Sequence, residues 1–302
     1  MTTSGWLLTA ALLLSGVAQA ADDKPLLRIG ARVFTEQTVL ATLTSQYLDS
    51  KGYRTEITGG LGSNIARSAQ ESGQLDLLWE YTGVSLVSYN HVNEKLSSDA
   101  TYARVKALDA KKGLTWLAPS KFNNTYALAL PDKIAQQYPE VNTITELNAL
   151  VKREKHKDHV LALDTEFANR PDGLVGLTEA YGLAFDRRDI RQMDAGLVYT
   201  ALRNGQVFTG LVYTTDGRLD AFKLKVLEDD RHYFPDYTAA PVVRQAVLDQ
   251  HPELASLLKP LAELLDNATM RQLNAKVDVD HQNPNAVAQA FLAAHPQLKE
   301  AK

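Results

Sequence analysis

The sequence predicts an α/β protein made of two lobes, with two chain crossings between them that form a hinge. The first observation is a β-α-β-α-β order of segments within residues 26–79, which gives parallel strands with helices on both faces of a sheet. The second is a similar alternation that starts again near Thr143. The third is the length: the chain has 302 residues, and a chain of this size commonly forms two domains or one large one.

Helix signals alternate with short apolar strands in the first unit. The helix that opens at Thr35 carries apolar residues at helical spacing, and Gly52 follows its end, as is common for a helix stop. A second helix carries Ile65 and ends at Gly73. Residues 59–64 are a Gly-rich turn, and they lack the Lys-Ser or Lys-Thr ending of a P-loop. The strands expected here are residues 26–30, 53–58 and 75–79.

The second unit and the C-terminal part repeat these signals. Further helices are expected at residues 101–112, 145–152, 173–181, 196–204, 244–251, 253–266, 267–276 and 285–294. Further strands are expected at residues 114–119, 127–130, 160–163, 207–213 and 223–227.

The expected crossings define two lobes. They fall near residues 123–127 and 213–217, so residues 24–125 and 216–302 form lobe 1 and residues 126–215 form lobe 2. The cleft between the lobes is then the expected ligand site, and the lobes are expected to close on the ligand by a hinge motion.

Residues 1–20 are typical of a secretory signal peptide. Their apolar stretch is too short to span a bilayer comfortably, and Ala18-Gln19-Ala20 forms a small-x-small cleavage site. A retained anchor is the weaker interpretation, because charged residues follow at once. The chain has no cysteine, which excludes thiol chemistry, cysteine metal sites and the lipid-anchored N-terminus of bacterial lipoproteins. We therefore expect cleavage after Ala20 and a free protein in the periplasm.

Composition and motifs give no sign of nucleic-acid binding or catalysis. The formal net charge is −4 with acidic and basic residues interspersed, and no basic stripe indicates nucleic acid. His156 and His159 are three residues apart but have no third ligand nearby, so no metal site is predicted. The motifs of zinc proteases and serine hydrolases are absent. The sequence therefore predicts no cofactor and no enzyme.

Four tyrosines in separated segments are the most informative feature of the chain. Tyr81, Tyr126, Tyr199 and Tyr213 each lie where an apolar run meets turn residues, and such strand ends hold ligands in open α/β folds. If the rings converge, they form a box whose π-faces suit a quaternary ammonium group, a cation with no N–H to donate. The competing interpretation of each is a core tyrosine whose hydroxyl reaches the surface.

Charged residues also follow the predicted strands. Arg32 comes after the first strand and Arg170 precedes a helix, and a guanidinium on such a loop can grip a carboxylate with two parallel hydrogen bonds. The alternative for each is a surface arginine paired with a nearby acid. Glu80 and Asp216 could serve acid–base chemistry, but structural roles are favoured because Asp216-Gly217 is an ordinary turn signal.

Taken in order, these segments resemble a known family. Over essentially the whole mature chain, the sequence is similar to the substrate-binding proteins of osmoprotectant ABC transporters, those for glycine betaine, choline and carnitine. The resemblance rests on residues 29–37 (IGARVFTEQ), 72–76 (SGQLD), 80–83 (EYTG), 123–126 (NNTY), 170–173 (RPDG), 213–217 (YTTDG) and 240–244 (APVVR).

The resemblance implies a bilobal periplasmic-binding-protein fold of type II, with two α/β lobes joined by a two-strand hinge. It implies that the four tyrosines hold the trimethylammonium group and that Arg32 and Arg170 hold the carboxylate. The family often has Lys in place of Arg32. It also often has, directly after Glu-Tyr-Thr-Gly, a Thr that helps to bind the carboxylate, and this chain has Val84 there.

The function expected from the resemblance is capture of a quaternary ammonium osmoprotectant and its delivery to the membrane permease of an ABC transporter. The chain is expected to act as a monomer. Two arginines favour betaine or carnitine over choline, which would leave positive charges unpaired. The alternatives are an exported α/β enzyme with Asp216 or Glu80 as a catalytic acid, a binding protein for an amino acid or polyamine, and a sensor domain that binds a small cationic metabolite.

Overall fold

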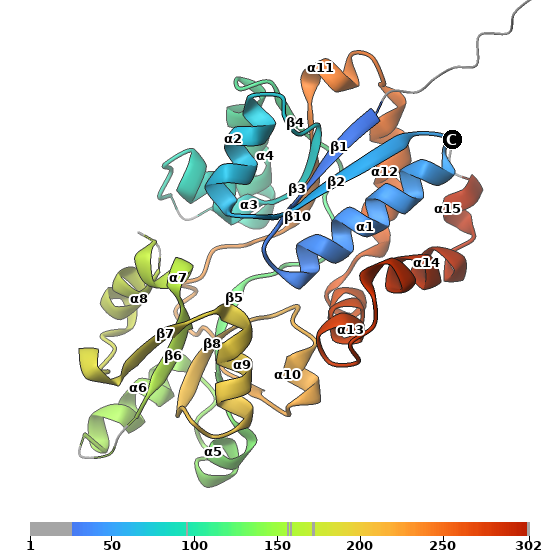
Figure 1. Ribbon diagram of the computed structural model, residues 1–302. Helices are drawn as coiled ribbons and strands as arrows, with labels where there is room; N and C mark the ends of the chain where they lie inside the picture. Colours follow the sequence, from blue (N-terminus) through green and yellow to red (C-terminus); the bar gives the residue numbers. More distant parts are fainter. Residues whose placement is uncertain (1–25, 95, 156, 158, 171–172, 301–302) are drawn as a thin grey trace, which may run out of the picture.

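The computed structural model describes residues 26–300 apart from residues 95, 156, 158 and 171–172. The predicted signal peptide, residues 1–20, lies outside the described residues. Figure 1 shows two lobes, each built around its own sheet, with both strands and helices in each. The predicted α/β class is therefore confirmed.

The first lobe contains a five-stranded sheet in the order β2-β1-β3-β10-β4. Its strands are β1 (Leu26–Arg32), β2 (Arg54–Leu61), β3 (Leu77–Tyr81), β4 (Leu114–Trp116) and β10 (Ala239–Arg244). β1 pairs in parallel with both β2 and β3, as the β-α-β-α-β order predicts. Because β1 and β3 are neighbouring parallel strands, the loops that follow them meet at the same edge of the sheet. This edge faces the other lobe (Figure 1).

Helices cover both faces of this sheet. On one face, α1 packs against α13 and α14. The helices of the lobe are α1 (Thr35–Ser50), α2 (Ser63–Glu71), α3 (Thr82–Val84), α4 (Ser98–Ala110), α11 (Gln245–Leu248), α12 (Glu253–Leu264), α13 (Asn267–Asp278), α14 (Pro284–Ala294) and α15 (Gln297–Glu300), with a π-helical turn at Ser85–Tyr89. The core lies between sheet and helices, and Ile29 and Leu77 of the sheet are buried in the same hydrophobic cluster as Val39 and Leu43 of α1.

The second lobe contains a five-stranded sheet in the order β7-β6-β8-β5-β9. Its strands are β5 (Tyr126–Leu130), β6 (Leu161–Asp164), β7 (Ile190–Met193), β8 (Thr209–Tyr213) and β9 (Lys225–Val226). Its helices are α5 (Asp132–Gln137), α6 (Ile144–Arg153), α7 (Thr165–Asn169), α8 (Leu174–Tyr181), α9 (Ala195–Arg203) and α10 (Arg218–Ala221), with a 3₁₀ turn at Arg187–Asp189.

Strand β10 is a correction to the sequence prediction, which placed a helix from residue 244 and no strand before it. β10 pairs antiparallel with β3 and β4 in the middle of the sheet although it contains Pro241, a residue that usually argues against a central strand. The carbonyl of Pro241 accepts the N–H of Leu117, which lies just past the end of β4. Since the N–H and C=O of an antiparallel residue face the same neighbour, the missing N–H of Pro241 falls where the ladder with β4 has ended.

The return of the chain to the first lobe also differs from the prediction. Strand β9 pairs with β5 of the second sheet, so the final connection is residues 227–238 rather than residues 213–217. The segment after β8 nevertheless contacts the first lobe, because α10 packs on α13 and Gly217 lies against Ala275. A Cβ on Gly217 would come within 2.5 Å of the Ala275 backbone. The chain thus touches the first lobe, goes back to the second sheet, and only then crosses.

Asp76 joins the starts of β1 and β3 to the end of β10. Its carboxylate accepts hydrogen bonds from the backbone N–H and the guanidinium of Arg28 and from the guanidinium of Arg244, at 2.8–2.9 Å for the closest contacts. Burial by itself would raise the pKa of Asp76, but the bonds from Arg28 and Arg244 outweigh it and lower the pKa below its usual value. The carboxylate is therefore bound more tightly when it is charged.

We expect Asp76→Asn to lower the free energy of unfolding by about 2 kcal/mol at pH 7, since it removes charge-assisted hydrogen bonds from a buried side chain. A lowered folded-state pKa gives stability that is present above the unfolded pKa of about 3.9 and is lost as pH falls through the folded pKa. Urea unfolding of both proteins at pH 7 and near pH 3 should therefore show the difference shrinking in acid. An equal difference at both pH values would contradict the assignment.

Candidate functional site

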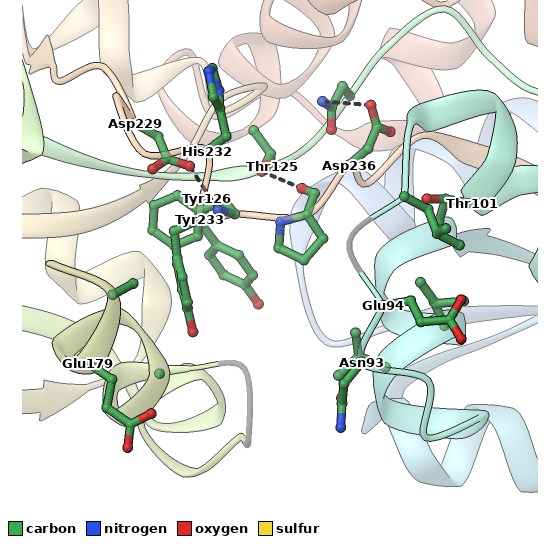
Figure 2. Close-up of a pocket in the computed structure, with 18 residues that line it drawn as sticks. Asn93, Glu94, Thr101, Thr125, Tyr126, Glu179, Asp229, His232, Tyr233 and Asp236 are labelled. Atoms are coloured by element: carbon green, nitrogen blue, oxygen red, sulfur yellow. Dashed lines mark hydrogen bonds between the residues drawn. The ribbon is translucent and has the colours of Figure 1, made fainter.

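Two cavities lie where the lobes meet. The first has a volume of about 920 Å³ and is lined by Glu94 of the first lobe, Glu179 of the second, and Tyr126 and Tyr233 between them (Figure 2). Figure 2 shows Asn93 and Glu94 on one side of this space and Glu179 on the opposite side. The second cavity, about 340 Å³, is lined by residues that include Phe34, Glu36, Asp164, Tyr199, Tyr213 and Asp216.

Tyr126 is the centre of an aromatic cluster at the junction of these cavities. It is the first residue of β5 and is the direct cross-strand partner of Tyr213 on β8, so the two side chains share a face. Their ring centroids are 5.0 Å apart. We define the aromatic cluster as Tyr126 with the four rings whose centroids lie within 6 Å of it: Phe167, Tyr213, Phe234 and Tyr237.

The sequence analysis did not predict three members of this cluster, Phe167, Phe234 and Tyr237, and Tyr237 is the tyrosine among them. Its ring meets that of Tyr126 edge-on, with centroids 5.3 Å apart, and it packs so closely over Gly83 that a Cβ there would lie 2.7 Å from the ring. It precedes β10, which runs antiparallel to β3, so the start of β10 lies at the same edge as the end of β3. The sequence signal for Tyr237 is therefore a tyrosine that follows turn residues and precedes an apolar run.

Tyr81 ends β3 on the side of the first lobe. Its side chain is buried, and its hydroxyl donates to Glu36 Oε1 at 2.7 Å while accepting from Gln37 Nε2 at 3.2 Å. Burial, followed by the nearby charge of Glu36, raises the pKa of Tyr81, so the phenol keeps its proton. Phe34 lies beside it, with ring centroids 6.2 Å apart.

Tyr199 lies behind Tyr213 in the core of the second lobe. It is 0 % exposed, its hydroxyl accepts the backbone N–H of Tyr213 at 2.8 Å, and the guanidinium of Arg218 covers one ring face at 4.1 Å. Although Tyr199 borders the second cavity, its contacts are those of a core side chain that supports the end of β8. The structure thus brings Tyr126 and Tyr213 into direct ring contact and gives Tyr199 a backbone contact instead.

We expect Tyr199→Phe to destabilise the fold by about 1–2 kcal/mol, because the buried N–H of Tyr213 loses its acceptor. Ligand affinity of the folded protein should change by less than about threefold, far below the effect of losing a cation contact. Urea unfolding and calorimetric titration check the two parts. A loss of affinity of tenfold or more in the folded variant would instead show that the Tyr199 hydroxyl contacts the ligand.

Arg170 of the second lobe joins two tyrosines of the aromatic cluster. It follows α7, and its Nη1 and Nη2 donate to the hydroxyls of Tyr126 and Tyr237, each at 3.0 Å. The guanidinium carbon lies 5.7 and 5.8 Å from the two ring centroids. The guanidinium cation of Arg170 is therefore held at the hydroxyl edges of the Tyr126 and Tyr237 rings.

Arg32 is held differently from Arg170. It ends β1, is 3 % exposed, and forms a buried ion pair with Glu80 of β3. Its guanidinium also lies 5.1 Å from the ring centroid of Tyr81. Burial raises the pKa of Glu80, and the charge of Arg32 opposes that rise. Among the described residues, Arg32 Nε and Glu80 Oε2 lack hydrogen-bond partners, so the pair retains one open donor and one open acceptor.

The part of the chain that the structure describes offers neither a metal cluster nor a membrane-spanning helix. It contains no group of three or more His, Cys, Asp and Glu side chains arranged to hold a metal ion. None of its helices combines the length and apolar character needed to span a bilayer.

The sequence matches the family described as "Substrate binding domain of ABC-type glycine betaine transport system" over residues 25–294. A glycine-betaine-binding protein of Pseudomonas aeruginosa is 53% identical, and the alignment covers 96% of this chain and 93% of that protein. The carnitine transport binding protein OpuCC of Listeria monocytogenes is 32% identical, with 95% and 93% covered.

Solved structures agree with these sequence matches. A structure described as a glycine betaine/carnitine/choline ABC transporter superposes with a TM-score of 0.75 at 28% identity, covering 90% of this chain and 99% of that one. Lactococcal OpuAC in its closed form with glycine betaine has a TM-score of 0.64 at 13% identity, covers 92% and 98%, and supports the fold alone. The predicted type II periplasmic-binding-protein fold is confirmed. The chain belongs to the family of substrate-binding domains of ABC-type glycine betaine transport systems.

Proposed function

We propose that this chain captures a small quaternary ammonium solute that carries a carboxylate, such as glycine betaine or carnitine, and delivers it to the permease of an ABC transporter. The observation that carries this proposal is the aromatic cluster around Tyr126 with Arg170 at its edge. A trimethylammonium group desolvated over ring faces gains about 2 kcal/mol or more. The planar guanidinium suits the carboxylate at the other end.

The proposed aromatic box is Tyr81, Tyr126, Tyr213 and Tyr237, so Tyr237 replaces Tyr199 in the set expected from the sequence. Support for this exchange comes from the contacts of the two side chains. Tyr237 touches the Tyr126 ring and the backbone of Gly83 beside Tyr81. Tyr199 has its hydroxyl bonded to the Tyr213 backbone and one ring face covered by Arg218.

Arg170 is the proposed main contact for the carboxylate, with Arg32 in a secondary role. The charge of Arg32 is balanced by Glu80 and its unpartnered Nε is buried, so Arg32 offers a ligand no full unpaired charge. Val84 brings no hydroxyl, and the hydroxyl of the nearby Thr82 already donates to the Asp236 carbonyl at 3.0 Å. Preference for a carboxylate over the alcohol of choline therefore depends mostly on Arg170.

Isothermal titration of the mature chain from Ala21 with glycine betaine, carnitine, choline and proline betaine tests the proposal. We expect saturable binding of betaine or carnitine that is tighter than the binding of choline. Tighter binding of choline would support the aromatic box but contradict the carboxylate contact. No heat with any of the four would overturn the proposed ligand class while leaving the fold and the family unchanged.

We also propose that the chain acts as a monomer in the periplasm after removal of residues 1–20. The small-x-small site that ends at Ala20 and the absence of cysteine support this location. Mass spectrometry of the protein from a periplasmic extract should give a chain that starts at Ala21. Light scattering should give the mass of one chain, and a retained N-terminus or a dimer would contradict the respective part.

A further inference from the structure

Glu36 is a buried carboxylate at the lobe junction that the proposed ligand contacts do not use. It is the second residue of α1 and is 3 % exposed. Its Oε1 accepts from the hydroxyl of Tyr81 at 2.7 Å and from Asn124 Nδ2 at 2.8 Å. Its Oε2 accepts from the hydroxyl of Thr215 at 2.6 Å and from Asn274 Nδ2 at 3.0 Å. The four donors come from four separate parts of the chain.

The surroundings of Glu36 satisfy a charged carboxylate without a cation. An ionised carboxylate has about four acceptor positions, and four donors are present. No Lys, Arg or His side chain forms an ion pair with Glu36 among the residues that the structure describes. Burial raises the pKa of Glu36, and the four hydrogen bonds oppose that rise. A buried charge held this way contributes little to stability compared with an apolar replacement, so another role explains it better.

One role concerns the ring of Tyr81. A phenol that donates to a carboxylate makes a short, strong hydrogen bond, and here the bond fixes the direction of the Tyr81 side chain. The partial transfer of charge toward the phenol also makes the ring more negative. Because a cation is attracted by the negative face of the ring, this contact favours a quaternary ammonium group at Tyr81.

A second role concerns the two tyrosines of the other lobe. Asn124 lies two residues before Tyr126 in the first connection, and Thr215 lies two residues after Tyr213. Asn274 of α13, in the first lobe, binds both Glu36 and the chain at Thr215, since its Nδ2 also donates to the Thr215 carbonyl at 2.9 Å. One carboxylate thus binds Tyr81 directly and holds the chain next to Tyr126 and next to Tyr213.

We propose that Glu36 is the positioning residue of the quaternary ammonium site: it sets the spacing of Tyr81 relative to the Tyr126–Tyr213 pair across the two lobes. This inference rests on the proposed function. Glu36 touches the tyrosine and the connecting chain rather than the ligand, so its effect should fall on the cation end of every ligand alike. It should leave the carboxylate end, held by Arg170, unaffected.

The test is a double-mutant cycle of Glu36→Gln and Tyr81→Phe, measured by calorimetric titration with glycine betaine and with choline. We expect Glu36→Gln to weaken both ligands by the same factor, about tenfold or more, because either orientation of the Gln amide turns its NH₂ toward the side-chain NH₂ of Asn124 or Asn274, which can only donate. Tyr81→Phe keeps the ring and removes the donor. In the Tyr81→Phe background, the effect of Glu36→Gln should be at least threefold smaller, since contacting residues are not additive.

Matched variants separate positioning from general damage. Glu56→Gln removes a carboxylate from the exposed face of β2 and should change neither affinity nor unfolding. Thr215→Val keeps the shape and removes one donor, so it should weaken both ligands by a smaller common factor. It also serves as the test if Glu36→Gln does not fold.

Three results would overturn the inference. They are an affinity of Glu36→Gln within twofold of the parent, additive effects in the cycle, and a loss for betaine without a loss for choline. If Glu36→Gln does not fold, an unchanged affinity of Thr215→Val overturns it. Titration of the parent protein tests the proposed function separately. If the parent binds neither ligand, the proposed function is wrong, and the inference about Glu36 is wrong with it.

Discussion

Replacing Tyr126 with alanine is expected to weaken glycine betaine binding by about 100-fold or more. The ring is the centre of the aromatic cluster, in contact with Tyr213 and Tyr237. A desolvated cation–π contact contributes about 2 kcal/mol or more, and the hydroxyl that accepts from Arg170 adds about 1 kcal/mol. Since about 1.4 kcal/mol corresponds to tenfold in affinity, the sum gives roughly two orders of magnitude. Calorimetric titration of the folded variant measures it.

The matched control is Tyr126→Phe, which keeps the ring and removes only the acceptor for Arg170. It should lose about three- to tenfold in affinity, in line with one ordinary hydrogen bond. Because alanine also leaves a hole in a packed cluster, the melting temperature of each variant must show that the protein is folded at the titration temperature. An alanine variant that binds betaine as tightly as the phenylalanine variant would remove Tyr126 from the cation site.

Replacing Arg170 with methionine should weaken the binding of ligands that carry a carboxylate and spare the binding of choline. Methionine keeps much of the packing of the arginine stem and removes the charged donors to the carboxylate, which are worth about 1.5–3 kcal/mol for a charged group. Betaine and carnitine should therefore bind about 10- to 150-fold more weakly. Choline has no carboxylate, and its affinity should stay the same or improve. Parallel titrations of the variant with the three ligands give the ratios.

Arg170→Lys is the control for charge alone. It keeps one positive charge but cannot donate in the planar, two-pronged geometry that reaches the hydroxyls of Tyr126 and Tyr237. We expect betaine affinity between that of the parent and that of Arg170→Met. If choline weakens as much as betaine in the methionine variant, Arg170 acts on the aromatic cluster rather than on the carboxylate.

The local order of the chain was sufficient to predict the α/β class and the parallel part of the first sheet. Thr35 and Gly52 mark the helix between β1 and β2, and such short-range signals determine which strands are parallel. β10 was missed because it contains a proline. That proline is tolerated only because β4 ends before reaching it, and no local sequence pattern reveals where a distant strand ends. β7 was missed because it is a four-residue edge strand with polar residues at Arg191 and Gln192.

For the candidate site, the sequence could indicate which residues lie at strand ends but not which contacts each of them makes. Tyr126 and Tyr213 both lie at strand ends, and antiparallel pairing brings them together. Tyr199 has a similar sequence context, but it lies on the face of α9 that packs against β8. The pairing of Arg32 with Glu80 follows from the neighbouring positions of β1 and β3. It joins residues far apart in the sequence, so the apparent two-arginine clamp could not be assessed from local motifs.

The contact of Gly217 and α10 with α13 has a mechanical consequence. Two chain connections alone allow one body to bend and also to twist relative to the other. A third contact between the lobes, beside the connections at residues 117–125 and 227–238, restricts twisting, so we expect the lobes to rotate about a single axis. With one such axis, each closure would return Tyr81 to the same position opposite Tyr126. Recognition can therefore be repeated over many transport cycles without a search for the correct alignment.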